Sequence, residues 1–165
     1  MENKTVVIVG GGPAGLFAAG ELADQGVRAV VLNRDIKPGG LAEYGIYPEK
    51  LKMKQGLRQQ FRRILQHPLV TYLGGVTVGK GGPLCLEDLR ERADAVLVAV
   101  GAQGTKWLGI PGEQLKGVYH AKHVAFYYNS LPPYSLSPLD LGDRVAIVGA
   151  GNVMTDIATY LIQVR

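Results

Sequence analysis

The chain has 165 residues and a net charge of +4, with 47% hydrophobic and 19% charged residues. This length and composition suit one well-buried globular domain and are too small for two complete ones. The mild basic excess fits anionic partners, but no aromatic-basic ladder or zinc-finger spacing accompanies it, so no nucleic acid partner is expected. The apolar runs are far shorter than the ~20 residues of a membrane span, so no membrane insertion is expected.

Met1 to Lys4 leads directly into the first predicted strand, without a signal peptide, and we therefore expect a cytoplasmic protein. Cys85 is the only cysteine. It excludes a disulfide within the chain, a C-x-x-C redox pair and a cysteine-ligated iron–sulfur cluster. We expect Cys85 to be a small buried thiol.

A glycine-rich motif follows the first predicted strand, Thr5–Val9, whose sequence TVVIV is typical of a strand buried on both faces. The motif opens a helix predicted over Ala14–Gln25, and a second strand is predicted over Arg28–Leu32. In this spacing one glycine permits a tight turn, one lets a pyrophosphate approach the backbone, and one lets helix and strand pack closely. The three glycines in G-x-G-x-x-G spacing are Gly10, Gly12 and Gly15. The order strand, glycines, helix, strand predicts a dinucleotide site on a parallel sheet.

Asn33 stands at the end of the second predicted strand, where dinucleotide-binding folds usually carry an acidic residue for the ribose hydroxyls. An amide donates and accepts hydrogen bonds but lacks the charge that makes a carboxylate a strong acceptor for a diol. We expect Asn33 to contact the ribose, and Asp35 is the alternative if the loop curls back. If Asn33 faces the ribose, Asn33→Glu is expected to tighten binding.

A helix is predicted from Pro48 to about Gln66, before Pro68. Its apolar stripe at helical spacing consists of Met53, Leu57, Phe61 and either Ile64 or Leu65. A row of four basic residues at successive i,i+4 positions consists of Lys50, Lys54, Arg58 and Arg62. This row is interpreted either as a solvated face or as a docking surface for an acidic partner or a cofactor phosphate.

Short β segments are predicted at Leu69–Leu73 and Val76–Val78, followed by helical turns at Glu87–Arg92. A fully buried strand, Ala95–Val100, is expected to join the first two strands in one parallel sheet. Beyond it the chain becomes proline-rich, and we expect a crossover with one helix near Ala121–Asn129. His120 and His123 have no third ligand in view and are interpreted as surface or capping residues rather than a metal site.

A second glycine motif lies near the end of the chain. A predicted strand, Val145–Val148, leads into Gly149-Ala150-Gly151-Asn152-Val153 and a helix. The sixth motif position is Met154, so helix and strand cannot approach as closely there as at the first motif. One strand and one helix cannot bury their faces without further strands, so we expect a truncated polypeptide.

Taken together, these motifs resemble the N-terminal part of the adrenodoxin-reductase-like ferredoxin–NADP reductases. These reductases belong to the wider flavoproteins with two dinucleotide domains, which include the glutamate synthase small subunit. The matching stretches are VVIVGGGPAGLFAA, KPGGLAEYGI, GGVTVG, ADAVLVAVGAQG, LGIPGE, GVYHAKHVAFYYNSLPP and VAIVGAGNVMTDIA. The resemblance implies an α/β fold with a Rossmann-like FAD-binding domain over residues 1–103. A crossover over 104–142 and the first strand and helix of an NAD(P)-binding domain over 143–165 would follow.

The resemblance also implies the cofactors, FAD at the first motif and NADP at the second. The implied FAD contacts are Gly10, Gly12, Ala14, Gly15, Leu41 and Val78, with Asn33 where the family commonly has Glu. The implied contacts to the NADP pyrophosphate are Gly149, Ala150, Gly151, Asn152 and Val153. The basic residues that select the 2′-phosphate of NADP in such reductases would lie beyond Arg165, so the resemblance does not decide between NADP and NAD.

The implied activity is electron transfer from NADPH through FAD to ferredoxin or a similar acidic carrier, which requires no acid–base catalytic residue in this chain. The alternative is an FAD-binding module, or an inactive fragment, that needs a partner chain to complete the NAD(P) site. The 165 residues alone are expected not to turn over NADPH. The last predicted helix has an apolar surface formed by Val153, Ile157, Leu161 and Ile162. It is expected to dock on the flavin domain, to pair with another molecule, or to be poorly ordered.

Overall fold

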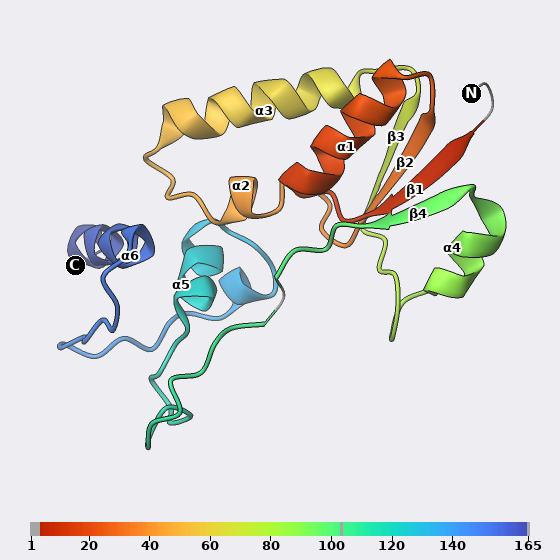
Figure 1. Ribbon diagram of the computed structural model, residues 1–165. Coiled ribbons are helices and arrows are strands. Elements are labelled where there is room, and N and C mark those ends of the chain that lie inside the picture. Colours follow the sequence, from red (N-terminus) through yellow and green to blue (C-terminus); the bar gives the residue numbers. More distant parts are fainter. Residues whose placement is uncertain (1–3, 103, 165) are drawn as a thin grey trace. The chain divides into compact units, whose positions relative to one another are not determined.

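The computed structural model describes residues 4–102 and 104–164, and the chain divides into two units (Figure 1). The first unit comprises Met1–Glu43 and Leu51–Gln103, and the second comprises Tyr44–Lys50 and Gly104–Arg165. The elements up to the last strand are β1 (Thr5–Val9), α1 (Pro13–Asp24), β2 (Arg28–Asn33), α2 (Leu41–Tyr44), α3 (Leu51–Leu65), β3 (Val70–Gly74), α4 (Leu86–Arg92) and β4 (Ala95–Val98). They are followed by α5 (Ala121–Tyr128), a 3-10 turn (Tyr134–Leu136) and α6 (Asn152–Gln163).

A parallel sheet with the strand order β3-β2-β1-β4 forms the centre of the first unit. β1 is hydrogen-bonded on both sides, and Val6 is paired with Ala29 of β2 and with Ala95 of β4. α1 connects β1 to β2, as the order of strand, glycines, helix and strand predicts. The parallel sheet expected from the sequence is therefore confirmed, and it places the carboxyl ends of β1, β2 and β4 at one edge.

The two faces of the sheet are buried by different helices because side chains alternate along each strand. Ile8 of β1 and Val31 of β2 pack with Ala19 of α1 on one face, which Ile64 of α3 also reaches. The opposite face buries a second cluster made of Val7, Val9, Leu32 and Leu89, of which the last belongs to α4. Figure 1 shows α1 and α3 next to each other on one side of the sheet. β1 is thus buried on both faces, as its run of β-branched residues predicts.

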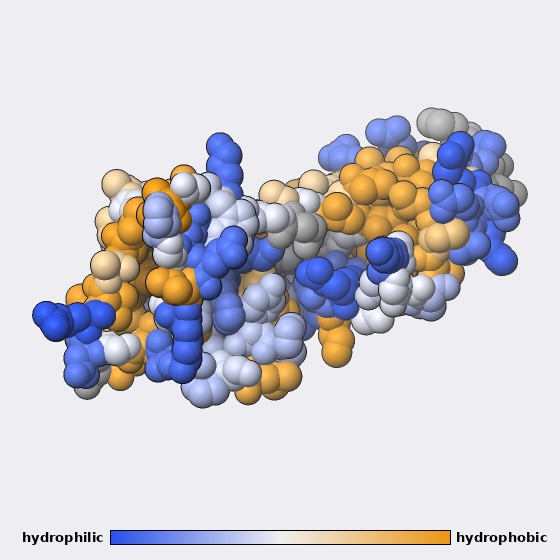
Figure 2. All heavy atoms as spheres, turned by 90° about the horizontal axis from the view of Figure 1, so that it is seen from below, coloured by the Kyte–Doolittle hydropathy of each residue, from blue (hydrophilic) through white to orange (hydrophobic). Residues whose placement is uncertain are grey.

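The last strand differs from its prediction in length and in burial. β4 ends at Val98, whose partner in the register is Val9, because β1 itself ends there and the chain turns at Gly10. β4 is also an edge strand among the described residues, and Leu97 and Val98 are exposed rather than buried. Figure 2 shows an extended apolar area on the surface of the unit that contains the sheet.

The apolar stripe predicted for α3 is partly wrong. The helix begins at Leu51 rather than Pro48, because Tyr47–Lys50 form a turn closed by the Lys50 N–H and the Tyr47 carbonyl at 3.0 Å. Met53 is exposed, and the buried positions are Lys54 and Phe61. The buried face of the helix therefore starts with a lysine, a choice that the hydrophobic pattern cannot predict.

Two further segments depart from the predicted strands. Val76–Val78 forms no strand and contributes one isolated parallel bridge, between Val78 and Leu84. Val145–Val148 also forms no strand, and its side chains are exposed. A parallel strand requires a neighbour for its backbone hydrogen bonds, and no described segment supplies one to residues 145–148.

The second unit is built around α5, α6 and the segment Tyr44–Lys50. The side-chain amide of Asn129 donates hydrogen bonds to the carbonyl oxygens of Tyr44 at 2.9 Å and Ile46 at 3.1 Å, which ties the segment to the end of α5. Lys50 pairs with Asp156 of α6 at 2.7 Å. The segment is thus held from both helices by polar groups.

α6 is docked through one buried side chain and through one polar side chain that makes two hydrogen bonds. Ile157 is 6% exposed, Gln163 donates to Glu49 at 2.7 Å, and Gln163 also accepts from the Tyr47 hydroxyl. Burial raises the pKa of Tyr128, which lies in edge contact with Tyr47, to about 12. The structure has this helix packed within the second unit, which was not among the three outcomes expected for it. Among the residues described, no helix has the length and apolar character needed to cross a membrane.

Ile157→Ala is predicted to release α6 from its unit. Removing a buried isoleucine side chain costs about 2 kcal/mol or more, so α6 amides should exchange hydrogen roughly 30-fold faster. The control is Ile162→Ala, because Ile162 is 78% exposed on the same helix and should leave exchange unchanged. Equal effects of the two substitutions, measured by hydrogen exchange, would contradict this packing of α6.

Candidate functional site

The first glycine motif forms the turn from β1 into α1. Gly10 has φ +116°, and its N–H donates to the carbonyl oxygen of Leu32 at 2.8 Å. A Cβ at Gly10 would overlap the carbonyl oxygen of Ala99, and a Cβ at Gly15 would overlap that of Gly10. Both positions therefore require glycine, one because of its backbone conformation and both because other backbone passes so close.

Gly12 lies in a different environment. It is the N-cap residue of α1, with φ −79° and no side-chain cap, and a Cβ there would meet no atom within 4 Å. Ala14, in the first turn of the helix, is exposed. The first N–H groups of a helix have no intrahelical partner and favour an anion, so this open cradle fits a pyrophosphate.

Asn33 connects the glycine loop to the loop that follows β2. The residue is only 8% exposed, and its Oδ1 accepts the N–H of Gly11 at 2.9 Å. Its Nδ2 donates to the carbonyl oxygens of Asp35 at 2.9 Å and Lys37 at 3.3 Å, and contacts the hydroxyl of Tyr72 at 3.0 Å. Both ends of the amide are thus engaged by the protein. A direct contact of Asn33 with a ribose stays a prediction, as does the alternative contact of Asp35.

Gly11 is held at both of its backbone polar groups. Its N–H bonds Asn33, and its carbonyl oxygen accepts the N–H of Gly39 at 2.7 Å. A Cβ at Gly11 would lie 2.9 Å from Cγ of Asn33 and 3.0 Å from the ring of Tyr72, so these two side chains pack directly against it. Tyr72 contacts the carbonyl oxygens of Asp35 and Ile36, each at 3.2 Å, and burial raises the pKa of Tyr72. Tyr72 and Gly39 were not singled out in the sequence, although a run such as Pro38-Gly39-Gly40 is typical of a turn.

Two other predicted contact residues flank this loop. Leu41 begins α2 and is exposed, and the preceding Gly40 packs closely on Gly12, since a Cβ at Gly40 would lie 3.1 Å from the Gly12 Cα. Val78 is half-buried and packs against the cluster that contains Val9. The first unit therefore brings Gly10–Gly15, Asn33 and Gly40–Leu41 together at the glycine loop. Val78 lies with the cluster that α4 covers.

The predicted basic row is not a continuous face. Lys50 lies before α3 and belongs to the second unit, and Lys54 is 6% exposed, with a pKa that burial lowers. Arg58 pairs with Glu43 at 2.8 Å, and this hydrogen bond lowers the pKa of the Glu43 carboxyl. Arg62 is exposed. Neither a uniform solvated face nor a four-residue docking surface describes this arrangement.

The second glycine motif also opens a helix. Gly149 has φ +132°, Gly151 is the N-cap residue of α6 with φ −92°, and a Cβ at either would meet no atom within 4 Å. Ala150, Asn152 and Val153 are exposed. The loop and helix were predicted correctly, but the strand expected before them is absent. Among the described residues, Gly149 and Gly151 thus lack the close approach of neighbouring backbone that shapes Gly10.

The remaining singled-out residues have structural roles. Cys85 is half-buried rather than buried and caps α4, where Asp88 raises the pKa of its thiol and accepts its N–H at 2.9 Å. His120 precedes α5 and stacks edge-on against Trp107 at 4.4 Å, and His123 packs against Tyr119. In the described parts of the chain, no cluster of three His, Cys, Asp or Glu side chains could hold a metal ion.

Gly10→Ala and Gly12→Ala should differ in their effect on the free energy of unfolding, because neighbouring backbone leaves no room for a Cβ at Gly10 but does at Gly12. Gly10→Ala is predicted to cost about 3 kcal/mol or more, because the new Cβ overlaps backbone and φ is positive. Gly12→Ala should cost about 1 kcal/mol, the ordinary difference between helix caps. Urea unfolding of both variants tests this, and similar losses would contradict the close approach at Gly10.

Asn33→Leu is predicted to lower the free energy of unfolding by about 1–3 kcal/mol, because it removes the partner of the buried Gly11 N–H and the amide donor to the carbonyl oxygens of Asp35 and Lys37. Asn33→Glu is likewise predicted to lower the free energy of unfolding, since a carboxylate would face the carbonyl oxygens of Asp35 and Lys37. Tighter cofactor binding by this variant, expected if Asn33 faces the ribose, stays a prediction. The control is Tyr72→Phe, which removes one hydroxyl and should cost about 1 kcal/mol. Wild-type stability of Asn33→Glu in urea unfolding would contradict this network.

Comparisons with known proteins agree with this architecture. The family model for pyridine nucleotide-disulphide oxidoreductases matches residues 4–165. The chain is 38% identical over 162 residues to the mitochondrial NADPH:adrenodoxin oxidoreductase of Arabidopsis thaliana, covering 96% of this chain and 33% of that protein. It is 35% identical over 165 residues to the NADPH-ferredoxin reductase FprA of Mycobacterium leprae, covering 95% and 36% respectively.

The structure of Mycobacterium tuberculosis FprA in complex with NADPH superposes with a TM-score of 0.86 at 33% identity, covering 96% of this chain and 36% of that one. The chain thus spans about a third of the length of these relatives. The resemblance to adrenodoxin-reductase-like reductases, inferred from the motifs, is confirmed by these matches. The chain belongs to the pyridine nucleotide-disulphide oxidoreductase family.

Proposed function

We propose that the first unit binds FAD as part of an NADPH-dependent flavoprotein that passes electrons to a ferredoxin-type carrier. The observation that carries this proposal is the open cradle at Gly12, next to two glycines that backbone contacts make obligatory. Membership of the family and similarity to an NADPH-ferredoxin reductase support the choice of cofactor and reaction class.

Different residues of the first unit would contact different parts of the cofactor. The N–H groups at the start of α1, around Gly12 and Ala14, would hold the pyrophosphate. Asn33 fixes Gly11, so the loop is organised before the ligand arrives and pays less ordering entropy on binding. Leu41 and Val78 would add apolar contacts. Bound FAD supplies the exchange between two-electron and one-electron chemistry.

The second unit would bind the pyrophosphate of NADP(H). Gly149, Ala150 and Gly151 lead into α6, whose first residues, Asn152 and Val153, would present their N–H groups to the phosphates. The FprA structure with NADPH covers this part of the chain and supports the assignment. In this proposal the first unit is the FAD domain, and residues 143–165 begin the NAD(P) domain.

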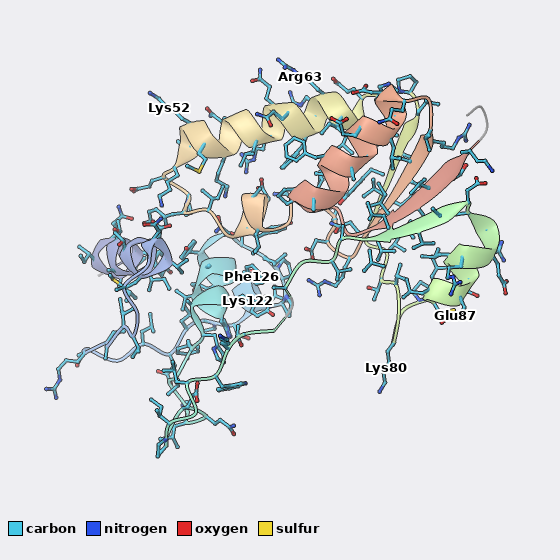
Figure 3. The ribbon with its side chains drawn as sticks, in the orientation of Figure 1. Lys52, Arg63, Lys80, Glu87, Lys122 and Phe126 are labelled. Atoms are coloured by element: carbon cyan, nitrogen blue, oxygen red, sulfur yellow. The ribbon has the colours of Figure 1, made fainter. Side chains whose placement is uncertain are left out.

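The electron acceptor would be an acidic carrier such as a ferredoxin. Lys52, Arg62 and Arg63 are exposed on α3, and Figure 3 shows Lys52 and Arg63 extending away from α1. Basic side chains attract an acidic carrier and accelerate its encounter. The cytoplasmic location expected from the sequence stays a prediction, because the similar proteins include mitochondrial ones.

FAD binding tests the proposal directly. The chain is titrated with FAD, and binding is followed by flavin fluorescence and by absorbance near 450 nm. Gly12→Asp is predicted to weaken binding at least tenfold, because it brings a carboxylate to the pyrophosphate, a cost of about 1.4 kcal/mol or more. Asp is a favourable N-cap residue, so the variant should fold.

The matched control is Gly151→Asp, which makes the same change at the other helix and should leave FAD affinity unchanged. Circular dichroism checks that both variants are folded. Absence of FAD binding to the wild-type chain, or a larger loss in Gly151→Asp than in Gly12→Asp, would contradict the assignment.

A further inference from the structure

β4 forms an open edge of the sheet in the first unit (Figure 1). It pairs in parallel with β1, and no other described strand pairs with it. The N–H of Ala99 donates to the carbonyl oxygen of Val9 at 2.8 Å, so this position faces β1. Backbone groups alternate in direction along a strand, so the N–H and C=O groups of Val96 and Val98 point to the open side. The edge therefore offers donors and acceptors to one more strand.

The sequence of this edge lacks the usual protection against strand pairing. Natural edge strands often carry a lysine or a proline that discourages a further strand. The run Ala95–Val100 has the sequence AVLVAV, which contains neither. Leu97 is 39% exposed and Val98 is 55% exposed. The edge thus presents apolar side chains together with unpaired backbone groups.

Two copies of this edge fit each other in an antiparallel register. A twofold axis at Leu97 places Val96 of each copy opposite Val98 of the other, and Leu97 opposite its own counterpart. The valines, whose backbone groups point outward, then form hydrogen-bonded pairs, and the leucines form the closer pair without hydrogen bonds. Asp94 lies opposite Val100 in this register, so no like charges face each other along the edge.

We propose that the chain self-associates through β4, which pairs antiparallel with β4 of a second copy. The sheet then continues across the twofold axis, and the contact uses the same surface of both copies. β4 has 4 residues, far fewer than the ~20–30 residues per side of a standard interface, so the dimer is reversible rather than obligate. This inference goes beyond the proposed function, and the FAD titration tests that function separately.

Sedimentation velocity over a series of protein concentrations measures the association. The wild-type chain is expected to pass from monomer to dimer as the concentration rises. Leu97→Lys places like charges opposite each other at the twofold axis and should raise the dissociation constant of the dimer about tenfold or more. The matched control is Ile162→Lys, which changes a 78% exposed position on α6 in a similar way and should leave association unchanged.

Charge complementation separates strand pairing from misfolding. Leu97→Glu alone should dimerise as weakly as Leu97→Lys. A mixture of the two variants should form a heterodimer, because opposite charges then meet across the axis. Circular dichroism checks that each variant is folded. A mixture that associates no better than either variant alone would contradict the pairing.

Cross-linking tests the register. Directly opposite residues without hydrogen bonds have Cα atoms about 4.5 Å apart, within the ~4.4–6.8 Å of disulfide-bonded cysteines. Cys85→Ser removes the native thiol and keeps a side chain that can cap α4. In this background, Leu97→Cys is expected to form an intermolecular disulfide under mild oxidation. Ile162→Cys, which is more exposed, should stay predominantly monomeric.

Three results would overturn the inference. A wild-type chain that stays monomeric throughout the series would leave this edge to a strand from a different polypeptide. Loss of the dimer in Ile162→Lys, with the dimer retained in Leu97→Lys, would assign the contact to α6. Faster cross-linking of Ile162→Cys than of Leu97→Cys would point to α6 as well.

Discussion

The hydrogen bond between the Gly11 N–H and Oδ1 of Asn33 is the constraint on which the nucleotide site depends. The glycine loop has few side chains of its own, so its shape must be fixed by backbone contacts and by neighbouring elements. Asn33 satisfies a buried N–H from one side, and the Gly39 N–H satisfies the Gly11 carbonyl from the other. A buried backbone group without a partner would cost about 1–3 kcal/mol, so these bonds select one loop conformation.

The two glycine loops of the chain show what a supporting strand contributes. At the first loop, β1 is paired on both sides. The turn at Gly10 lies so close to Ala99 that the Cβ of any larger residue would overlap the Ala99 carbonyl oxygen. At the second loop, Gly149 also has a positive φ, but residues 145–148 are unpaired in the described part of the chain, and a Cβ at Gly149 would meet open space. Two similar glycine motifs therefore yield a shaped cradle in one unit and an exposed turn in the other.

Much of the first unit could be predicted from its sequence. The β-branched runs of β1 and β2, the glycine spacing and the helix between them specify a parallel sheet by local pattern alone, and the structure has the strands within two residues of their predicted ends. The strand at 145–148 was predicted by the same reasoning and is wrong, because a strand depends on a partner that its own residues do not reveal. The Tyr47–Lys50 turn, which shortens α3, belongs to the second unit. The local sequence does not reveal this assignment either.

The site was harder to predict than the fold. Asn33 was recognised from its position after β2, but its hydrogen bonds to Tyr72 and to the Lys37 carbonyl join segments up to 39 positions apart. The burial of Lys54 likewise follows from the packing of α3 and contradicts a hydrophobic pattern that favours Met53. Such contacts arise from tertiary structure, and residue type alone does not indicate them.

The most direct measurement is a residue-resolved NMR study of the chain before and after addition of FAD. A loop organised by Asn33 predicts that the Gly11 amide exchanges with solvent as slowly as the amides of β1, in both states. It also predicts that the amide signals of Gly12 and Ala14 shift on binding, whereas those of Gly149–Val153 stay in place. Rapid exchange at Gly11, or FAD-induced shifts confined to Gly149–Val153, would contradict the account.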